Sequence, residues 1–214
     1  MKIAFLGNVA NNFYIIAKYL RKCSDIDAHL FLGKIFDTQY LPENVDPELK
    51  DNYPEWIHYY KSLSNTSILK FWDRSHFKAL SEYDAVVLSG PYVAYAPYLK
   101  NNTIFFTTGG DLTLLPFPKK FSFLNKTLFK KLRTFVRGYF QRKGIKKVDQ
   151  IWTQPFSPFQ LALKNLKVHP NKIKDAYFPL IVDTETYKLD PEAHKSSDSN
   201  IRMIVDNFNF VLFH

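Results

Sequence analysis

The stretch "TIFFTTGGDLT", residues 103–113, places an apolar run directly before two glycines and a carboxylate. A strand that is apolar at every position is buried on both faces, as in a parallel sheet that is covered by helices. The runs "KIAFLG" (residues 2–7) and "AVVL" (residues 85–88) have the same character. The three runs together predict a sheet of parallel strands.

Strands and helices are expected to alternate along the chain. Strands are expected at residues 2–7, 28–33, 85–88, 104–107, 150–153 and 174–180, and helices at 11–23, 67–80, 92–100, 125–143 and 158–166. This alternation predicts an α/β fold with a doubly wound, mainly parallel, Rossmann-like sheet flanked by helices. The acidic, proline-bearing segment 37–55 is expected to be a long surface loop.

The C-terminal end of the chain differs in composition from the rest. Residues 186–200 are polar and linker-like, and the apolar run "VLF" follows at residues 211–213. We expect a Rossmann-like domain over residues 1–185, and over 186–214 a linker and the start of a second domain that is cut off. In the alternative, the terminal run pairs with the edge of the first sheet.

Composition excludes several classes of protein. The 214 residues are 46% apolar and contain one cysteine, Cys23, so no internal disulfide can form. The apolar run at the N-terminus is too short for a signal peptide, and no run of about 18 apolar residues is present. We therefore expect a cytoplasmic protein. The chain lacks a G-x-G-x-x-G fingerprint and a P-loop, and its six histidines show no ligand spacing, so no cofactor and no metal are expected.

Four segments follow the ends of predicted strands, and all are small, polar or glycine-bearing. Because the carboxyl ends of parallel strands meet at one edge of the sheet, these segments are expected to line one cleft. Single features also have structural explanations, since glycine favours turns and Asn11 and Ser157 are good helix caps. The candidate binding residues are Gly7, Asn8, Asn11, Ser89, Gly90, Thr108, Gly109, Gly110, Gln154 and Ser157, with Asp111 as the one carboxylate.

The predicted helix at 125–143 lies in a strongly basic segment. Residues 119–147 hold eleven Lys or Arg and no Asp or Glu, although the whole chain has a net charge of only +9. Its apolar stripe is expected to cover the sheet while the cations face water. A solvated face normally mixes charges, so the unbroken basic face suits an anionic membrane surface, which implies peripheral attachment to the inner face of a membrane. Nucleic acid is the weaker alternative, because no recognition motif is present. The candidate membrane contacts are Lys126, Lys130, Lys131, Arg133 and Arg137.

The segment 148–188 resembles the end of the N-terminal domain of GT-B fold glycosyltransferases of the family 4-like type. The matching features, in order, are Asp149, Ser157, Lys172 with Ile173, Pro179, Val182 with Asp183, and Tyr187. The stretch "TTGGDLTLLPF" is similar to the family's His-Gly-x-Asp segment, with Thr108 where histidine is frequent, so no histidine-based role carries over. The resemblance extends over most of residues 1–188.

The resemblance implies an acceptor-binding N-terminal domain whose donor-binding partner domain would begin near Ile201. The implied activity is hexosyl transfer in polysaccharide biosynthesis, from a nucleotide-sugar donor to a saccharide or lipid-linked acceptor, and this chain alone is expected to be inactive. Asp111 would be the general base in an inverting enzyme and would orient the acceptor in a retaining one. Two alternatives stay open: a non-catalytic α/β module that binds a sugar or an anion, and a sugar-nucleotide epimerase of the same bilobal form.

Overall fold

The computed structural model describes residues 1–33, 40–50, 52–60, 75–118 and 128–176, without the side chains of 75, 76 and 128–131. The chain separates into two compact units, Met1–Phe178 and Pro179–His214. All elements below belong to the first unit. The second unit lies outside the described residues, as do the predicted domain boundary after residue 185 and the terminal run at 211–213.

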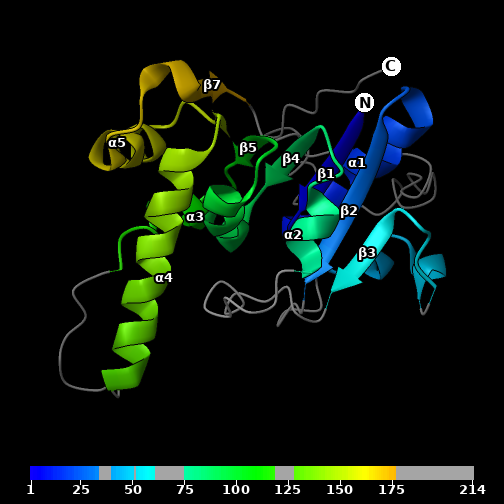
Figure 1. Cartoon of the computed structure of the whole chain (residues 1–214), viewed down its shortest axis with the longest axis horizontal. Coiled ribbons are helices and arrows are strands. Elements are labelled where there is room, and N and C mark those ends of the chain that lie inside the picture. Colours follow the sequence, from blue (N-terminus) through cyan, green and yellow to red (C-terminus); the bar gives the residue numbers. More distant parts are fainter. Residues whose placement is uncertain (34–39, 51, 61–74, 119–127, 177–214) are drawn as a thin grey trace, which may run out of the picture. The chain divides into compact units, whose positions relative to one another are not determined.

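One parallel sheet of seven strands organises the described part of the chain (Figure 1), in the order β3-β2-β1-β4-β5-β6-β7. The chain builds outward from β1 to β3, returns to place β4 beside β1, and then builds outward in the other direction. The strands are β1 (Lys2–Leu6), β2 (Asp27–Gly33), β3 (Ile57–Tyr60), β4 (Ala85–Leu88), β5 (Asn102–Phe106), β6 (Gln150–Thr153) and β7 (Ile173–Asp175). The predicted doubly wound, parallel α/β fold is confirmed.

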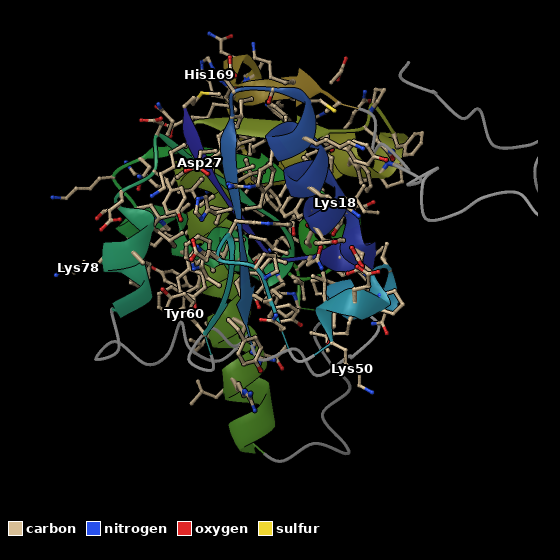
Figure 2. The ribbon with its side chains drawn as sticks, turned by 90° about the vertical axis from the view of Figure 1, so that its right-hand side faces the viewer. Lys18, Asp27, Lys50, Tyr60, Lys78 and His169 are labelled. Carbon is tan, nitrogen blue, oxygen red and sulfur yellow. The ribbon has the colours of Figure 1, made fainter. Side chains whose placement is uncertain are left out.

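Helices cover both faces of this sheet. Figure 2 places Lys18 of α1 and Lys78 of α2 on opposite sides of the strands. On the α1 side, the ring of Phe13 packs against Phe5 of β1 and Phe106 of β5, at centroid distances of 5.1 and 5.8 Å. The helices are α1 (Asn12–Cys23), α2 (Ser75–Leu80), α3 (Gly110–Thr113), α4 (Leu128–Lys147) and α5 (Ser157–Leu166), with the 3-10 turns η1 (Val9–Asn11), η3 (Pro42–Asn44), η4 (Pro47–Leu49), η6 (Gly90–Tyr98) and η7 (Pro170–Lys172).

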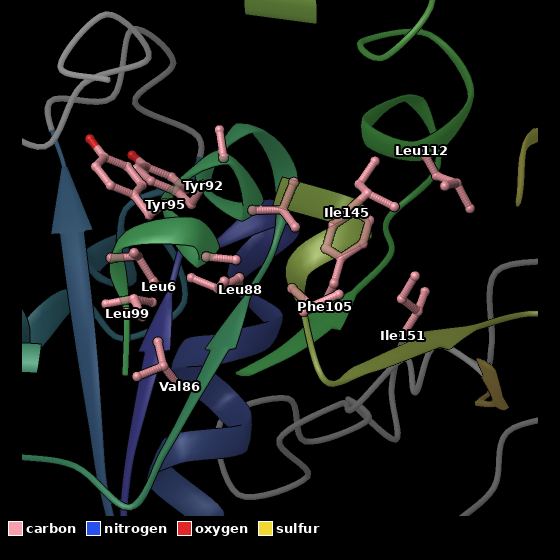
Figure 3. Packing of buried hydrophobic residues seen from close by; sticks show 14 of the residues in the cluster. Leu6, Val86, Leu88, Tyr92, Tyr95, Leu99, Phe105, Leu112, Ile145 and Ile151 are labelled. Carbon is pink, nitrogen blue, oxygen red and sulfur yellow. The ribbon is translucent and has the colours of Figure 1, made fainter. Parts of the chain in front are cut away.

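The larger core lies on the opposite face, under η6, α3 and the C-terminal end of α4. Its side chains come from alternate positions of the central strands, such as Leu6, Leu88 and Phe105, all fully buried. Figure 3 shows Phe105 beside Ile145 of α4, with Leu112 of α3 close to both. Because this face and the α1 face are both buried, the central strands are apolar throughout rather than at every second position.

Several predicted elements differ in detail from the structure. The strand β3 was not predicted, because "IHYY" at 57–60 is short and half-buried at the sheet edge. The helix expected at 92–100 is the 3-10 segment η6, which contains Pro97. The expected surface loop contains η3 and η4, and Tyr14 donates a hydrogen bond to Asp46 there at 2.8 Å. Parts of the helix expected at 67–80 and the strand expected at 174–180 lie outside the described residues.

The expectation that the apolar stripe of the basic helix is covered holds only in part for its described residues: Val136 and Phe140 are half-buried, and Phe140 packs against the core. Leu132, Phe135 and Tyr139 are 59%, 60% and 51% exposed. The helix packs instead through its C-terminal end, where Gly144 and Ile145 are buried. A side chain at Gly144 would begin 2.1 Å from the carbonyl oxygen of Val93, so α4 crosses η6 in contact with its backbone. No helix in the described ranges combines the length and the apolar character needed to cross a bilayer.

Candidate functional site

The candidate site lies at the carboxyl edge of the sheet, where β1 and β4 are neighbours and the winding direction changes. The segments that follow β1, β4 and β5 meet here. Val9 approaches Gly90, since a side chain at Gly90 would begin 4.0 Å from a methyl group of Val9. Ligands of open parallel sheets bind at such a switch point, because two adjacent loops turn away from each other there.

Asp111 connects the segments after β4 and β5. Its carboxylate is 4% exposed and accepts hydrogen bonds from the backbone N–H of Gly90, from the backbone N–H of Thr108 and from the Thr108 hydroxyl, at 3.0, 3.0 and 3.1 Å. Burial raises the pKa of the Asp111 carboxyl, and hydrogen bonds from Thr108, Gly90 and Gly109 oppose this rise. The carboxylate therefore holds two site loops together.

Gln141 of α4 joins the same two loops from the other side. Its amide nitrogen donates to the carbonyl oxygens of Gly90 and Asp111, at 3.1 and 2.9 Å, and the side chain is 3% exposed. The sequence pattern predicted no role for this residue. A signal was present, since Gln141 is the one carboxamide side chain in 128–147, between apolar and basic neighbours. Its burial depends on the crossing of α4 over η6, which the sequence alone does not show.

The nitrogen and the oxygen of the Asn8 side-chain amide both form hydrogen bonds within the protein. Its oxygen accepts from the backbone N–H of Tyr14, in the first turn of α1, at 3.0 Å. Its nitrogen donates to the side-chain oxygen of Asn11 and to the carbonyl of Tyr40, at 2.7 and 2.8 Å. Asn8 thus caps the helix N-terminus and connects the β1 segment to the chain at Tyr40.

Ser89 differs from these residues because its hydroxyl has no hydrogen-bond partner among the described residues, although it is only 1% exposed. The hydroxyl lies against Gly7, where a β-carbon would be 2.6 Å from it, so only glycine fits there. Buried hydroxyl groups normally have a partner. Ser89 therefore retains hydrogen-bonding capacity at the β1/β4 switch point.

Gly109 provides open space beside this point. Its φ of +122° is a conformation that glycine adopts readily and other residues avoid. No described atom lies within 4 Å of where a side chain at Gly109 would begin. A ligand could therefore approach the backbone closely at this residue, between Thr108 and the exposed Gly110.

The remaining predicted residues are less closely connected. Thr107 after β5 donates to Thr153 of β6 at 2.9 Å, which links the carboxyl ends of these two strands. Gln154 is half-buried and Ser157 exposed, and no hydrogen bond among the described residues joins them to Asp111. Arg133 and Arg137 lie on α4 before Gln141, and no hydrogen bond among the described residues joins them to these loops. Lys126 and the side chains of Lys130 and Lys131 lie outside the description.

Chemically, the site offers hydroxyl and backbone groups for hydrogen bonding to a polar, uncharged ligand. Its one carboxylate accepts hydrogen bonds from protein groups through both oxygens. Among the described residues, no group of three or more His, Cys, Asp or Glu side chains is placed to hold a metal ion.

Comparison with known proteins shows similarity at the level of structure. No protein-family model and no curated protein sequence matches the chain. The structure of Anabaena HepE in complex with UDP-glucose is 15% identical with a TM-score of 0.50, and the HepE complex with UDP is 14% identical with a TM-score of 0.49. Both matches cover 96% of this chain and 50% of HepE. A wide-type short-chain dehydrogenase/reductase of Veillonella parvula in complex with NADP is 13% identical with a TM-score of 0.35, over 72% of this chain and 68% of that one.

This chain therefore spans half the length of the HepE structures that it matches. At 15% identity the likeness establishes the fold, a Rossmann-like α/β sheet that is consistent with one half of a GT-B fold.

Proposed function

We propose that this chain is the acceptor-side part of a glycosyltransferase that transfers a sugar, of hexosyl type, from a nucleotide-sugar donor to a saccharide or membrane-associated acceptor. The observation that carries the proposal is the match to half of HepE, at a TM-score of 0.50, in a structure that holds UDP-glucose. A second domain would supply the donor site, and this chain alone would be inactive. The need for a second domain follows from the family resemblance.

The acceptor would bind at the β1/β4 switch point. The space beside Gly109 admits a ligand close to the backbone, and the buried Ser89 hydroxyl has free hydrogen-bonding capacity that a ligand would reach once the loops over it move apart. Sugar hydroxyl groups are both donors and acceptors, so they suit a serine hydroxyl and backbone groups. In this proposal, Gly7, Gly90 and Thr108 shape the surface, while Asn8 and Asn11 hold the loop in place.

The catalytic role of Asp111 stays a prediction. A general base needs a lone pair directed at the acceptor hydroxyl. Because the carboxylate already accepts from Gly90 and Thr108, the hydrogen bonds favour a positioning role for it. The same observation favours the second candidate function, a non-catalytic sugar-binding module, since such a module needs ordered loops and no base.

Amide NMR spectra of the 214-residue chain test the acceptor site. We expect saccharides or a lipid-linked sugar to shift the resonances of Gly7, Ser89, Gly90 and Gly109, whereas UDP-glucose leaves them unchanged. Ser89→Ala should weaken saccharide binding about five-fold, because a hydrogen bond to a neutral group is worth about 1 kcal/mol. The matched control is Ser81→Ala, a serine that is exposed after α2.

Two outcomes would count against the proposal. If no saccharide in a broad panel shifts these loops, or if UDP-glucose shifts them in place of saccharides, the acceptor site is wrong. Incubation with UDP-glucose gives a second readout. Sugar transfer by this chain alone would contradict the expected inactivity, and conversion of UDP-glucose into its epimer would support the epimerase alternative.

A further inference from the structure

The N-terminal part of α4 presents an exposed row of large apolar side chains. Leu132, Phe135 and Tyr139 are 59%, 60% and 51% exposed, and we call them the apolar row. They are spaced by three and four residues, so they share one side of the helix. Isolated exposed leucines are common on protein surfaces, but three large side chains in a row on one helix form a continuous surface.

Arg133 and Arg137 lie eight and four residues before the buried Gln141, so they share its side of α4 and are less exposed than the apolar row. The exposed Lys143 and Lys146 lie on the side of the apolar row. Arg133 and Arg137 are half-buried, and the Nε atom of Arg137 has no hydrogen-bond partner among the described residues. Burial and the charge of Arg133 lower the pKa of Arg137. Within the described ranges, no ion pair joins α4 to a carboxylate, and residues 119–147 contain no Asp or Glu. The helix therefore combines an apolar row with unneutralised positive charge.

The apolar row also lies away from the buried core. The contacts that attach α4 to η6 come from its C-terminal half, through Gln141, Gly144 and Ile145. Figures 1 and 2 both show the N-terminal end of α4 extending past the strands. Because the core does not cover the apolar row, its side chains are available to an external partner.

We propose that the apolar row of α4 inserts into the surface of an anionic lipid bilayer, while the exposed Lys143 and Lys146, which continue the same side of the helix beyond Tyr139, contact lipid phosphates. An amphipathic helix binds in this way when apolar side chains are flanked by cations, because burial of apolar surface and attraction to anionic headgroups add together. The sequence predicted a membrane contact made by the basic face of this helix, with the apolar stripe of the helix turned inward. The exposed row supplies the apolar part of the binding energy. This contact is independent of sugar transfer and of the switch-point loops.

Charge decides between a bilayer and the other partners. A second copy of this chain would bring two segments with eleven cations each against one another, which like-charge repulsion opposes. Nucleic acid would satisfy the lysines, but its phosphate backbone offers no apolar phase for Leu132 and Phe135. An anionic bilayer satisfies both kinds of side chain.

Co-sedimentation with lipid vesicles tests the proposal. We expect the chain to bind phosphatidylcholine vesicles that contain phosphatidylglycerol and to bind pure phosphatidylcholine vesicles more weakly. Leu132→Ser and Phe135→Ser, each tested alone, should lower the partition coefficient about ten-fold, because each removes a large apolar group that the bilayer would bury. Lys143→Gln should lower it about five-fold on anionic vesicles and leave it unchanged on neutral ones.

Leu161→Ser is the matched control. Leu161 lies on α5 and is 58% exposed, close to the value for Leu132, so the same change removes the same exposed surface outside α4. Its vesicle binding should equal that of the unmodified chain. If Leu161→Ser weakens binding as much as Leu132→Ser, or if the chain does not bind anionic vesicles at low salt, the proposal is refuted.

A fluorescent probe locates the insertion. In a Cys23→Ser background, Phe135→Cys labelled with an environment-sensitive dye should shift to shorter wavelength on vesicles and be quenched by lipid-borne nitroxide, and labelled Leu161→Cys should show neither effect. A lower melting temperature for Phe135→Ser would show that Phe135 packs against its own chain. Lipid-free dimerisation that Phe135→Ser abolishes would assign the row to a second copy. Either result would overturn the proposal.

Discussion

At the scale of single residues, the site depends on side chains that bond to the backbone of other loops. The Asp111 carboxylate accepts from Gly90, and the Gln141 amide donates to the carbonyl of the same glycine. One carboxylate and one amide thereby satisfy both backbone groups of Gly90 in a buried place. A hydrogen bond across 21 residues, as between Gly90 and Asp111, fixes the distance between two loops that a ligand would contact together.

Replacement of Asp111 by asparagine should destabilise the fold by about 1–3 kcal/mol. The new amide group would place N–H donors against the N–H donors of Gly90 or Thr108, so buried donors would lose their acceptor. Urea denaturation measures the change in the free energy of unfolding. The control is Asp175→Asn, the same change at an exposed carboxylate on β7, which should have little effect.

Equal stability of Asp111→Asn and the unmodified chain would show that the carboxylate is not needed to hold the loops. In an active full-length enzyme, kcat separates the two roles further. A large loss of kcat at unchanged stability would assign Asp111 to the chemistry, and a near-normal kcat would remove it from the reaction.

At the scale of elements, α4 is a helix with two different halves. The C-terminal half crosses η6 in contact with its backbone, and Lys172 of η7 donates to the carbonyls of Lys146 and Val148 at its end. The N-terminal half exposes Leu132 and Phe135. A single continuous pattern of apolar and basic residues thus serves a core contact at one end and a free surface at the other.

We expect Gly144→Ala to destabilise the fold by about 1–3 kcal/mol, since the added methyl group would begin 2.1 Å from the Val93 carbonyl oxygen and neither backbone can yield freely. The loss should appear although alanine favours a helix over glycine by about 1 kcal/mol. Thermal and urea denaturation would report it.

Gly110→Ala is the control for this change. A β-carbon at Gly110 would meet only the flexible side chain of Leu114, at 3.4 Å, so alanine is expected to be neutral or slightly stabilising there. Equal effects of the two substitutions would mean that the close crossing of α4 over η6 does not form in solution.

At the scale of the whole molecule, the free energy of unfolding is expected to depend on pH through a pair of histidines at the β2–β3 end of the sheet. The rings of His29 and His58 stack with centroids 5.1 Å apart, and Nδ1 of His29 lies 2.8 Å from Nε2 of His58. The other nitrogen of His29 contacts Asp27 at 3.0 Å. Burial lowers the pKa of His58, and the positive charges of His29 and Lys2 lower it further.

The free energy of unfolding should therefore fall as the pH drops below about 6.5. His58 takes up a proton less readily in the folded than in the unfolded chain, so the unfolded state gains protons first. The stabilisation is complete above the unfolded pKa and is lost as the pH falls through the folded pKa. Urea denaturation between about pH 7.5 and about pH 5 measures this slope.

His58→Gln is the informative variant, because glutamine can still donate a hydrogen bond to His29 but does not titrate. Its pH profile should be flatter than that of the unmodified chain over the same range. Identical profiles for the two proteins would show that His58 does not contribute to the pH dependence.

The sequence by itself determined the fold class and the edge of the sheet where a site can lie. Strands such as Ala85–Leu88 and Asn102–Phe106 are apolar without alternation, which only a covered parallel sheet accommodates, and parallel strands bring Gly7, Ser89 and Thr108 to one edge. These conclusions follow from local pattern, because a strand's periodicity reports how many of its faces are buried.

Only the tertiary structure decided which candidate side chains already form hydrogen bonds within the protein. Asn8 and Asp111 are polar residues in loops, and nothing local distinguishes a ligand contact from a bond to Tyr14 or Gly90. The exposure of Phe135 and the burial of Gln141 likewise depend on where α4 crosses η6, which a small residue, Gly144, permits at one point. Periodicity shows that a helix has an apolar side, but the partner across the contact decides how much of that side is covered.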